Sequence, residues 1–243
     1  LKFKDCFNVS KKEASKYVVN CLNLAHILCK KKLINSFINC PIDKNLIKKN
    51  GIYGVTEFLG RKHLSSKFSA VMFLHNKKLS VVPITTHLKI KEVSKNIKKK
   101  LIIKKIKTII IYYKKLFYKK PKIAVLGLNP HCETIEKIGE EQKEIIPAIR
   151  RLRYEKLNIK GPFSADTFFI KKNIDYYDVV VGMYHDQVLT PLKTLYNFNA
   201  INITIGLPFI RISPDHGPNI SMYGKNKSDP SSIFCAMDFL NKN

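Results

Sequence analysis

Apolar strands that end abruptly in polar side chains are the feature that most constrains the fold of this chain. The apolar run at 179–183 leads directly into the letters YHDQ at 184–187. The same pattern occurs at 79–87, LSVVPITTH, and at 122–128, KIAVLGL, which is followed by NPH. Segments with helical spacing separate these runs, and strands that alternate with helices predict an α/β fold. In open α/β sheets ligands bind at the carboxyl ends of strands, so we expect a site where these polar residues gather.

Hydrophobic periodicity predicts the remaining elements along the chain. We expect helices at 9–32, 44–50, 54–64, 139–157 and 230–240, two amphipathic helices within 89–120, strands at 33–38, 122–128, 179–183 and 201–205, a hairpin of strands at 69–75 and 79–87, and a loop at 161–167. Ser10 is the expected N-cap of the first helix. Lobe boundaries are expected near residues 120 and 215.

The composition excludes several classes of protein. The formal charge of +26 invites a nucleic-acid interpretation, but lysine supplies almost all of it, and the arginines that nucleic-acid sites favour are few. No apolar run reaches the roughly 18 residues of a membrane helix. The start of the chain has no apolar signal-peptide core, so we expect a cytoplasmic protein. The six cysteines form no CxxC pair and are expected to be reduced.

Three histidines share one position relative to the predicted strands. His87, His131 and His185 each follow an apolar strand directly. If those strand ends converge on one edge of the sheet, three neutral imidazoles there would form a divalent metal site with an open coordination position. The alternative is three strand-end histidines that are hydrogen-bonded independently. His216 is close enough in sequence to support such a site indirectly.

A second polar set lies near the last of these histidines. Lys193, Asn202 and Arg211 could together hold a phosphate or a carboxylate, which arginine binds through two parallel hydrogen bonds. Asp166 could act as a base or orient a metal-bound group. A metal beside an alcohol lowers its pKa, so this set suits oxidation of a small phosphorylated hydroxy acid. No GxGxxG motif follows a strand, so a standard Rossmann dinucleotide site is not predicted.

Several ordered motifs resemble one enzyme family. They are GLNPH at 127–131, GPFSADT at 161–167, MYHDQ at 183–187, LK at 192–193 and NITIGLPFIRISPDHG at 202–217. In this order they resemble the 4-hydroxythreonine-4-phosphate dehydrogenase family of the pyridoxal 5'-phosphate pathway, and the likeness runs from about residue 10 to the end.

The resemblance implies a two-lobed fold like that of isocitrate and isopropylmalate dehydrogenases, with a mixed sheet flanked by helices. It implies a homodimer with an interfacial active site and NAD or NADP as cofactor. The divalent metal (zinc, magnesium or cobalt) would be held by His87, His131 and His185. The substrate would be bound by Thr56, Lys193, Asn202 and Arg211. We expect Asp166 and Lys193 to be the catalytic residues. The reaction would oxidise 4-phosphooxy-L-threonine, and loss of CO2 would give 3-amino-2-oxopropyl phosphate.

On this interpretation residues 1–120 form an incomplete first lobe, 121–215 the central metal- and substrate-binding lobe, and 216–243 a C-terminal segment that packs back on the fold. The family's glycine-rich N-terminal segment has no counterpart here. Three local departures stand out. Val55 replaces a substrate-binding histidine, Glu133 replaces a glycine beside a metal ligand, and Asp43 puts an acid near an anionic substrate.

Four functions remain open from the sequence. The first is the dehydrogenase itself, and the second is a member of the same family that acts on another four-carbon acid phosphate. The third is a catalytically decayed remnant, and the fourth is a non-catalytic basic protein that binds polyanions. No specific nucleic acid and no membrane are expected as partners. The six matching residues (His87, His131, His185, Lys193, Asn202 and Arg211) argue against free decay.

Overall fold

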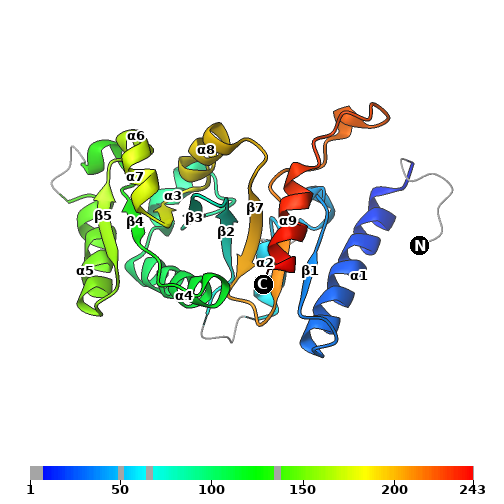
Figure 1. Cartoon of the computed structure of the whole chain (residues 1–243), viewed down its shortest axis with the longest axis horizontal. Helices are drawn as coiled ribbons and strands as arrows, with labels where there is room; N and C mark the ends of the chain where they lie inside the picture. The colour runs from blue at the N-terminus through cyan, green and yellow to red at the C-terminus, as the bar shows by residue number, and fades with distance from the viewer. Residues whose placement is uncertain (1–7, 49–51, 64–67, 134–137, 243) are drawn as a thin grey trace.

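The protein is described by a computed structural model over residues 8–48, 52–63, 68–133 and 138–242 (Figure 1). One mixed eight-stranded sheet runs through the described part in the order β1-β8-β7-β2-β3-β6-β4-β5. The strands are β1 (Ser36–Ile38), β2 (Val71–His75), β3 (Ser80–Pro83), β4 (Ile123–Leu126), β5 (Ile159–Phe163), β6 (Val179–Gly182), β7 (Ile201–Ile205) and β8 (Ile210–Pro214). The helices are α1 (Lys11–Lys30), α2 (Val55–Arg61), α3 (Ile90–Asn96), α4 (Lys99–Phe117), α5 (Ile146–Tyr154), α6 (Ala165–Phe168), α7 (Lys171–Tyr176), α8 (His185–Tyr196) and α9 (Ser231–Asn241).

Strand directions place one set of strand ends on a common edge. β3, β6, β4 and β5 are mutually parallel, and β7 shares their direction because β2 is antiparallel to both β3 and β7. The segments after β3, β4 and β6 therefore leave the same edge of the sheet, as the sequence pattern predicts. These are the segments that carry His87, His131 and His185.

Alternating side chains of the strands bury two faces of the sheet. In β6, Val179 and Val181 belong to a core covered by α3, α4, α5 and α9, while Val180 belongs to a second core covered by α6, α7 and α8. Both faces are apolar because helices cover both, which explains the nearly continuous apolar runs of the parallel strands. Figure 1 shows α4 and α8 on opposite faces. A third, smaller core joins α1 and α2 to the Leu207–Phe209 turn.

Most of the predicted elements are confirmed. Ser10 caps α1 by accepting a hydrogen bond from the backbone N–H of Glu13, and β2 and β3 form the predicted antiparallel hairpin. The long lysine-rich segment forms α3 and α4, whose apolar stripes face the core. The predicted helix at 139–157 forms as a wide π-type turn, Glu141–Ile145, followed by α5.

Two predictions about local structure need correction, and one helix was not predicted. The segment 161–167 is not a loop throughout, because its first residues complete β5 beside β4 and α6 follows. The residues after His185 form α8, which the sequence pattern did not reveal because Pro191 interrupts the expected helical signal. Only a short 3₁₀ turn, Lys44–Leu46, forms in the predicted helix at 44–50, and its last residues lie outside the described part.

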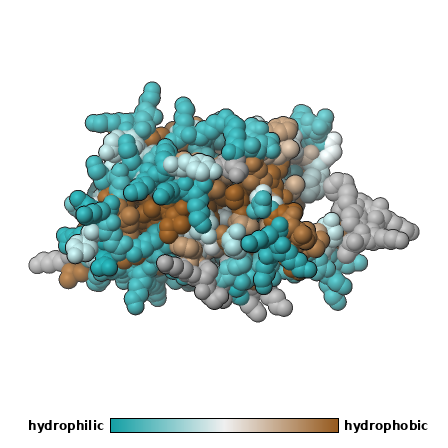
Figure 2. Space-filling model, turned by 60° about the horizontal axis from the view of Figure 1, so that its bottom comes forward, coloured by the Kyte–Doolittle hydropathy of each residue, from teal (hydrophilic) through white to brown (hydrophobic). Residues whose placement is uncertain are grey.

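The sheet places strands from 1–120 and from 121–215 side by side, because β2 pairs with β7 and β3 with β6. The division into lobes stays a prediction. On the face shown in Figure 2, apolar surface runs through the middle and is bordered by hydrophilic side chains. Among the described residues, no helix is both long and apolar enough to cross a membrane.

Candidate active site

A cavity of about 300 Å³ lies over the face of β2, β7 and β8, between α2, α8 and the loop around residues 39–47. It gathers six of the residues singled out by sequence, namely Thr56, His87, His185, Lys193, Asn202 and Arg211. His216 lies in its wall as well. Five segments that are distant in sequence therefore meet at one place, which local pattern alone does not require.

His87 is held by a carboxylate and an ammonium. Its Nδ1 lies 3.1 Å from Oε1 of Glu57, and Nζ of Lys44 lies 3.2 Å from its Nε2. An ionised carboxylate only accepts hydrogen bonds and an ammonium only donates them. In the neutral tautomer with hydrogen on Nδ1, the ring donates to Glu57 and its Nε2 accepts from Lys44. The Nε2 lone pair of His87 therefore faces the cavity.

Glu57 is well suited to fix this tautomer. Burial alone would raise the pKa of Glu57, but the hydrogen bonds from His87 and from the Thr86 hydroxyl help to lower it to about 2. The Thr86 hydroxyl donates to Oε1 over 2.8 Å. Lys105, buried on α4, donates to the carbonyl of Ile84 and adds positive charge nearby, while its own burial lowers its pKa to about 8.

His185 opens α8 and lies next to His87, with ring centroids 5.7 Å apart. Its Nδ1 lies 2.7 Å from Oδ1 of Asp186, and its Nε2 has no hydrogen-bond partner in the part of the chain that the structure describes. Burial lowers the pKa of His185, the Asp186 carboxylate opposes that shift, and the charges of His87 and Lys44 add to it. Two imidazoles thus share one cavity, each with Nδ1 turned to a carboxylate.

His131 and Asp166 lie outside this cavity. Nδ1 of His131 is 3.7 Å from Oδ2 of Asp166, and the two side chains are 74% and 55% exposed. Within the described residues of a single chain, no group of three His, Cys, Asp or Glu side chains is arranged to hold a metal. The chain by itself therefore brings together two of the three predicted metal ligands, and it places the predicted catalytic Asp166 beside the third.

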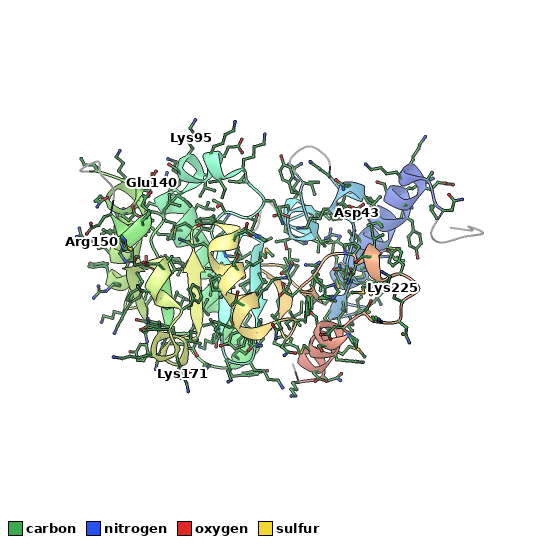
Figure 3. The ribbon with its side chains drawn as sticks, turned by 90° about the horizontal axis from the view of Figure 1, so that it is seen from above. Asp43, Lys95, Glu140, Arg150, Lys171 and Lys225 are labelled. Carbon is green, nitrogen blue, oxygen red and sulfur yellow. The ribbon has the colours of Figure 1, made fainter. Side chains whose placement is uncertain are left out.

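The loop that carries His131 is nevertheless firmly anchored. Glu141 is fully buried and accepts hydrogen bonds from the backbone N–H groups of Leu128 and Asn129 at 2.7 and 2.8 Å. The Asn129 amide also donates to Glu141 and to Glu140. Figure 3 shows Glu140 at the end of the molecule opposite Asp43.

Gln187 ties the His131 and His185 loops together. Its Oε1 accepts from the backbone N–H of Met183 at 2.6 Å, and its Nε2 donates to the carbonyl of Gly127 at 2.8 Å. Met183 follows β6 and Gly127 follows β4, the neighbouring parallel strand. One buried amide therefore fixes the spacing of two strand ends, each of which leads to a histidine.

The floor of the cavity is cationic. Arg211 is 3% exposed and donates through Nε to Oδ1 of Asn39 (2.7 Å) and through a terminal nitrogen to the hydroxyl of Thr204 (3.1 Å). The Thr204 hydroxyl also meets that of Thr56 at 3.0 Å. Burial lowers the pKa of Arg211 to about 9, against the effect of the Glu57 charge, so the guanidinium stays protonated at neutral pH.

Lys193 and Asn202 complete that floor. The Lys193 ammonium donates to the backbone carbonyl of Asp215 over 2.6 Å and lies 3.5 Å from its carboxylate. Burial raises the pKa of Asp215, although the charge of Lys193 opposes this. The amide oxygen of Asn202 is buried and has no hydrogen-bond partner among the described residues. Buried polar atoms are nearly always paired, so this oxygen indicates a position that a polar ligand would fill.

The three departures from the family motifs have clear structural outcomes. Val55 is buried in the cavity wall at the start of α2, where it offers an apolar surface. Glu133 has a φ of −123°, which any residue adopts, so the loss of glycine there causes no backbone strain. The Asp43 carboxylate caps the turn that follows it by accepting from the backbone N–H of Asn45, and it does not line the cavity.

Sequence reasoning missed several functional candidates. Glu57, Lys44 and Asn39 contact the predicted site residues directly, yet none was assigned a role. Glu57 follows Thr56 in the motif GVTE, and Lys44 ends the motif PIDK, so both signals were present in the sequence. Asn39 carries no comparable signal, because its role depends on β1 lying beside β8.

Comparison with known proteins agrees with this geometry. Residues 2–240 match the family described as pyridoxal phosphate biosynthetic protein PdxA. The chain belongs to this family. It is 42% identical over 236 residues to a 4-hydroxythreonine-4-phosphate dehydrogenase of Sulfurihydrogenibium sp. (strain YO3AOP1), covering 96% of this chain and 72% of that protein.

Solved structures give the same picture of the PdxA fold. The chain is similar to a 4-hydroxythreonine-4-phosphate dehydrogenase from Klebsiella pneumoniae, with a TM-score of 0.77 and 31% identity, covering 93% of this chain and 70% of that one. An isocitrate dehydrogenase from Methylococcus capsulatus shares the fold alone, with a TM-score of 0.53 and 12% identity over 96% of this chain and 81% of that chain. The chain spans 60% to 72% of the length of its first curated relatives.

Proposed function

We propose that this chain catalyses NAD(P)-linked oxidation, with decarboxylation, of 4-phosphooxy-L-threonine to 3-amino-2-oxopropyl phosphate. The supporting observation is the cavity itself, which sets a pair of carboxylate-oriented histidines beside a cationic floor made by Arg211 and Lys193. A metal-assisted alcohol oxidation needs the histidine pair, and an anionic substrate needs the cationic floor. The curated relatives carry the name of this activity.

The residues present fit two ligands of a divalent metal. The Nδ1 atoms of His87 and His185 face Glu57 and Asp186, which is the carboxylate–histidine arrangement that orients metal ligands. Nε2 of His185 faces no partner among the described residues, and Nε2 of His87 would become available to a cation once the Lys44 ammonium leaves it. The exposed His131 is the proposed third ligand, supplied by a second copy of the chain in a homodimer. A cation held there would polarise the substrate hydroxyl and the carbonyl that it becomes.

The cavity floor is the proposed phosphate site. Arg211, Lys193 and the hydroxyl of Thr56 are donors that suit a phosphate, and charge-assisted hydrogen bonds are the strong ones. The amide oxygen of Asn202, unpaired among the described residues, only accepts hydrogen bonds, so it would face a donor group of the substrate and not the phosphate. Lys193 holds the Asp215 carbonyl now, and it would exchange that neutral partner for a charged one. The protein residues thereby orient the hydroxyl carbon toward the two histidines.

The metal, the cofactor, the assembly and the roles of Asp166 and Lys193 are also part of this proposal. The metal is zinc, magnesium or cobalt, and the cofactor is NAD or NADP. The assembly is a homodimer in the cytoplasm, without a specific nucleic-acid partner. Asp166 lies beside His131, so it is proposed to orient that imidazole, and Lys193 is proposed to stabilise charge on the substrate.

A second candidate function is favoured by one observation. Val55 gives the cavity an apolar wall at the position where the family resemblance implies a histidine, so another four-carbon acid phosphate is the alternative substrate. Loss of one hydrogen bond costs roughly 1 to 3 kcal/mol of substrate affinity. A panel of phosphorylated hydroxy acids, including threonate and erythronate phosphates, separates the two.

The decisive experiment is NAD(P) reduction by the purified chain with 4-phosphooxy-L-threonine and a divalent metal. Wild type is expected to form NAD(P)H, His185→Ala to lose both turnover and bound metal, and His26→Ala, outside the cavity, to keep both. Metal binding without turnover on any of the tested substrates would contradict the proposed activity. Turnover that survives His185→Ala would contradict the site.

A further inference from the structure

Three lysine or arginine side chains line the active-site cavity, and they differ in what already pairs with them. Arg211 is buried between Asn39 and Thr204, and Lys193 lies between the carbonyl and the carboxylate of Asp215. Lys44 is exposed and forms no ion pair with any described residue, and its ammonium meets only the neutral Nε2 of His87 at 3.2 Å. Arg211 and Lys44 both lack a carboxylate partner among the described residues, and Lys44 is the exposed one of the two.

Asp43, the residue before Lys44, uses its carboxylate to cap a turn. Asp43 accepts from the backbone N–H of Asn45 at 2.9 Å and caps the turn Lys44–Leu46. This cap fixes the backbone at Lys44. The two neighbouring side chains then point to different places, since Lys44 lines the cavity and Asp43 does not. Lys44 lies at the histidine end of the cavity. Its ammonium contacts His87, and its charge helps to lower the pKa of His185.

The proposed substrate carries two anionic groups, one on each side of the carbon that bears the reacting hydroxyl. With that hydroxyl at the two histidines, the two anions must point toward different parts of the cavity. A phosphate, with the larger charge, matches the floor where Arg211 and Lys193 lie together. The remaining carboxylate carries a single charge, which matches a single ammonium.

We propose that Lys44 binds the substrate carboxylate and so selects hydroxy acids over phosphorylated alcohols. This assignment rests on the proposed function and adds to it a residue that decides specificity. The Lys44 ammonium would leave Nε2 of His87 when the metal binds there, and it would then gain the substrate carboxylate as a charged partner. The exchange replaces a hydrogen bond to a neutral ring nitrogen with an ion pair between an ammonium and a carboxylate.

The test compares two ligands that differ only in the carboxylate. The first is 4-phosphooxy-L-threonine and the second is 3-amino-2-hydroxypropyl phosphate, which lacks the carboxylate. Both are titrated calorimetrically into metal-loaded protein without NAD(P), so that no turnover occurs. The variants are Lys44→Met, Lys44→Arg and Lys48→Met, an exposed lysine four residues away that does not line the cavity.

Wild type and Lys48→Met are expected to prefer the carboxylated ligand by about tenfold or more, as expected for a hydrogen bond to a charged group. Lys44→Met should bind both ligands with similar affinity, and Lys44→Arg should keep part of the preference. Zinc titration of Lys44→Met in the same buffer shows whether metal binding is intact. This readout is independent of substrate.

Three results would overturn the assignment. If Lys44→Met weakens both ligands equally, Lys44 acts through His87 or on the phosphate. If Lys44→Met keeps the wild-type preference, the carboxylate binds elsewhere. If wild type binds neither ligand, the proposed function fails and the Lys44 assignment fails with it, whereas the first two results refute Lys44 alone and leave the dehydrogenase standing.

Discussion

His75 provides a quantitative test of the described packing, because its imidazole lies among aromatic rings at the end of β2. Its ring centroid is 4.7 Å from that of Phe117 and 5.6 Å from that of Phe239, and its Nδ1 meets the hydroxyl of Ser80 at 2.9 Å. No carboxylate pairs with it among the described residues, and burial lowers the pKa of His75 to about 4 from an ordinary value of 6.5.

The direction of the pH effect follows from these two values. As the pH falls below 6.5, the unfolded chain binds a proton at this position while the folded chain does not, so the free energy of unfolding decreases until the pH approaches 4. Between about pH 7.5 and about pH 5, a pKa lowered from 6.5 to about 4 decreases the free energy of unfolding by roughly 2 kcal/mol. Residual solvent exposure of the ring reduces the expected loss to about 1 to 2 kcal/mol.

The perturbation is His75→Gln, which keeps a hydrogen-bonding group near Ser80 and removes the titration. Urea unfolding of wild type and variant at the two pH values gives a double difference that cancels the other titrating groups. The stability advantage of wild type over the variant should shrink by about 1 to 2 kcal/mol at the lower pH. His216→Gln, at the half-exposed mouth of the cavity, controls for loss of an imidazole. An advantage that stays constant with pH would refute the buried placement of His75.

Three further outcomes are expected. Gln187→Met should weaken metal affinity about 10- to 100-fold in calorimetry while thermal unfolding stays cooperative, because the variant unties the two histidine loops. Glu57→Gln should weaken metal binding similarly, since a neutral amide no longer fixes the tautomer of His87. Gly206→Ala should lower the free energy of unfolding by about 2 kcal/mol or more in urea titrations, because φ is +90° there and a Cβ would run into the carbonyl oxygen of Ser69.

Each of these outcomes has a result that would contradict it. Unchanged metal affinity in Gln187→Met would show that the spacing of the two strand ends does not control the site. A Glu57→Gln variant that binds metal like wild type would mean that the tautomer of His87 is fixed by other groups. A Gly206→Ala protein as stable as wild type would require a different path for the turn after β7.

Much of the architecture was predictable because local physics dictates it. The apolar run at 179–183 must be buried on both faces, and it forms the central strand β6. Ser10 and the stripe that follows it specify α1, and the two apolar runs around residues 76–78 specify the β2–β3 hairpin. The helix α8 was missed because Pro191 masks its periodicity, although the polar residue pattern placed His185 at the correct strand end.

The site was predictable only in part. Six predicted residues line one cavity, yet Glu57 and Lys44 were not assigned although both contact His87. Their roles depend on the packing of α2 and of the 39–47 loop against the end of β3. No local spacing encodes that packing, because the segments are separated by dozens of residues and meet through the sheet.

The sequence by itself determined that this is an α/β chain whose strands end in histidines, and it carried the ordered motifs of the PdxA family. Only the tertiary structure decided which of those histidines share a cavity. His87 and His185 meet because β3 and β6 are neighbours, while His131, which follows the next strand, is turned to Asp166 and to solvent. Strand order and side-chain direction are set by long-range pairing, so the same three motifs could have been placed together or apart with no change in their local sequence.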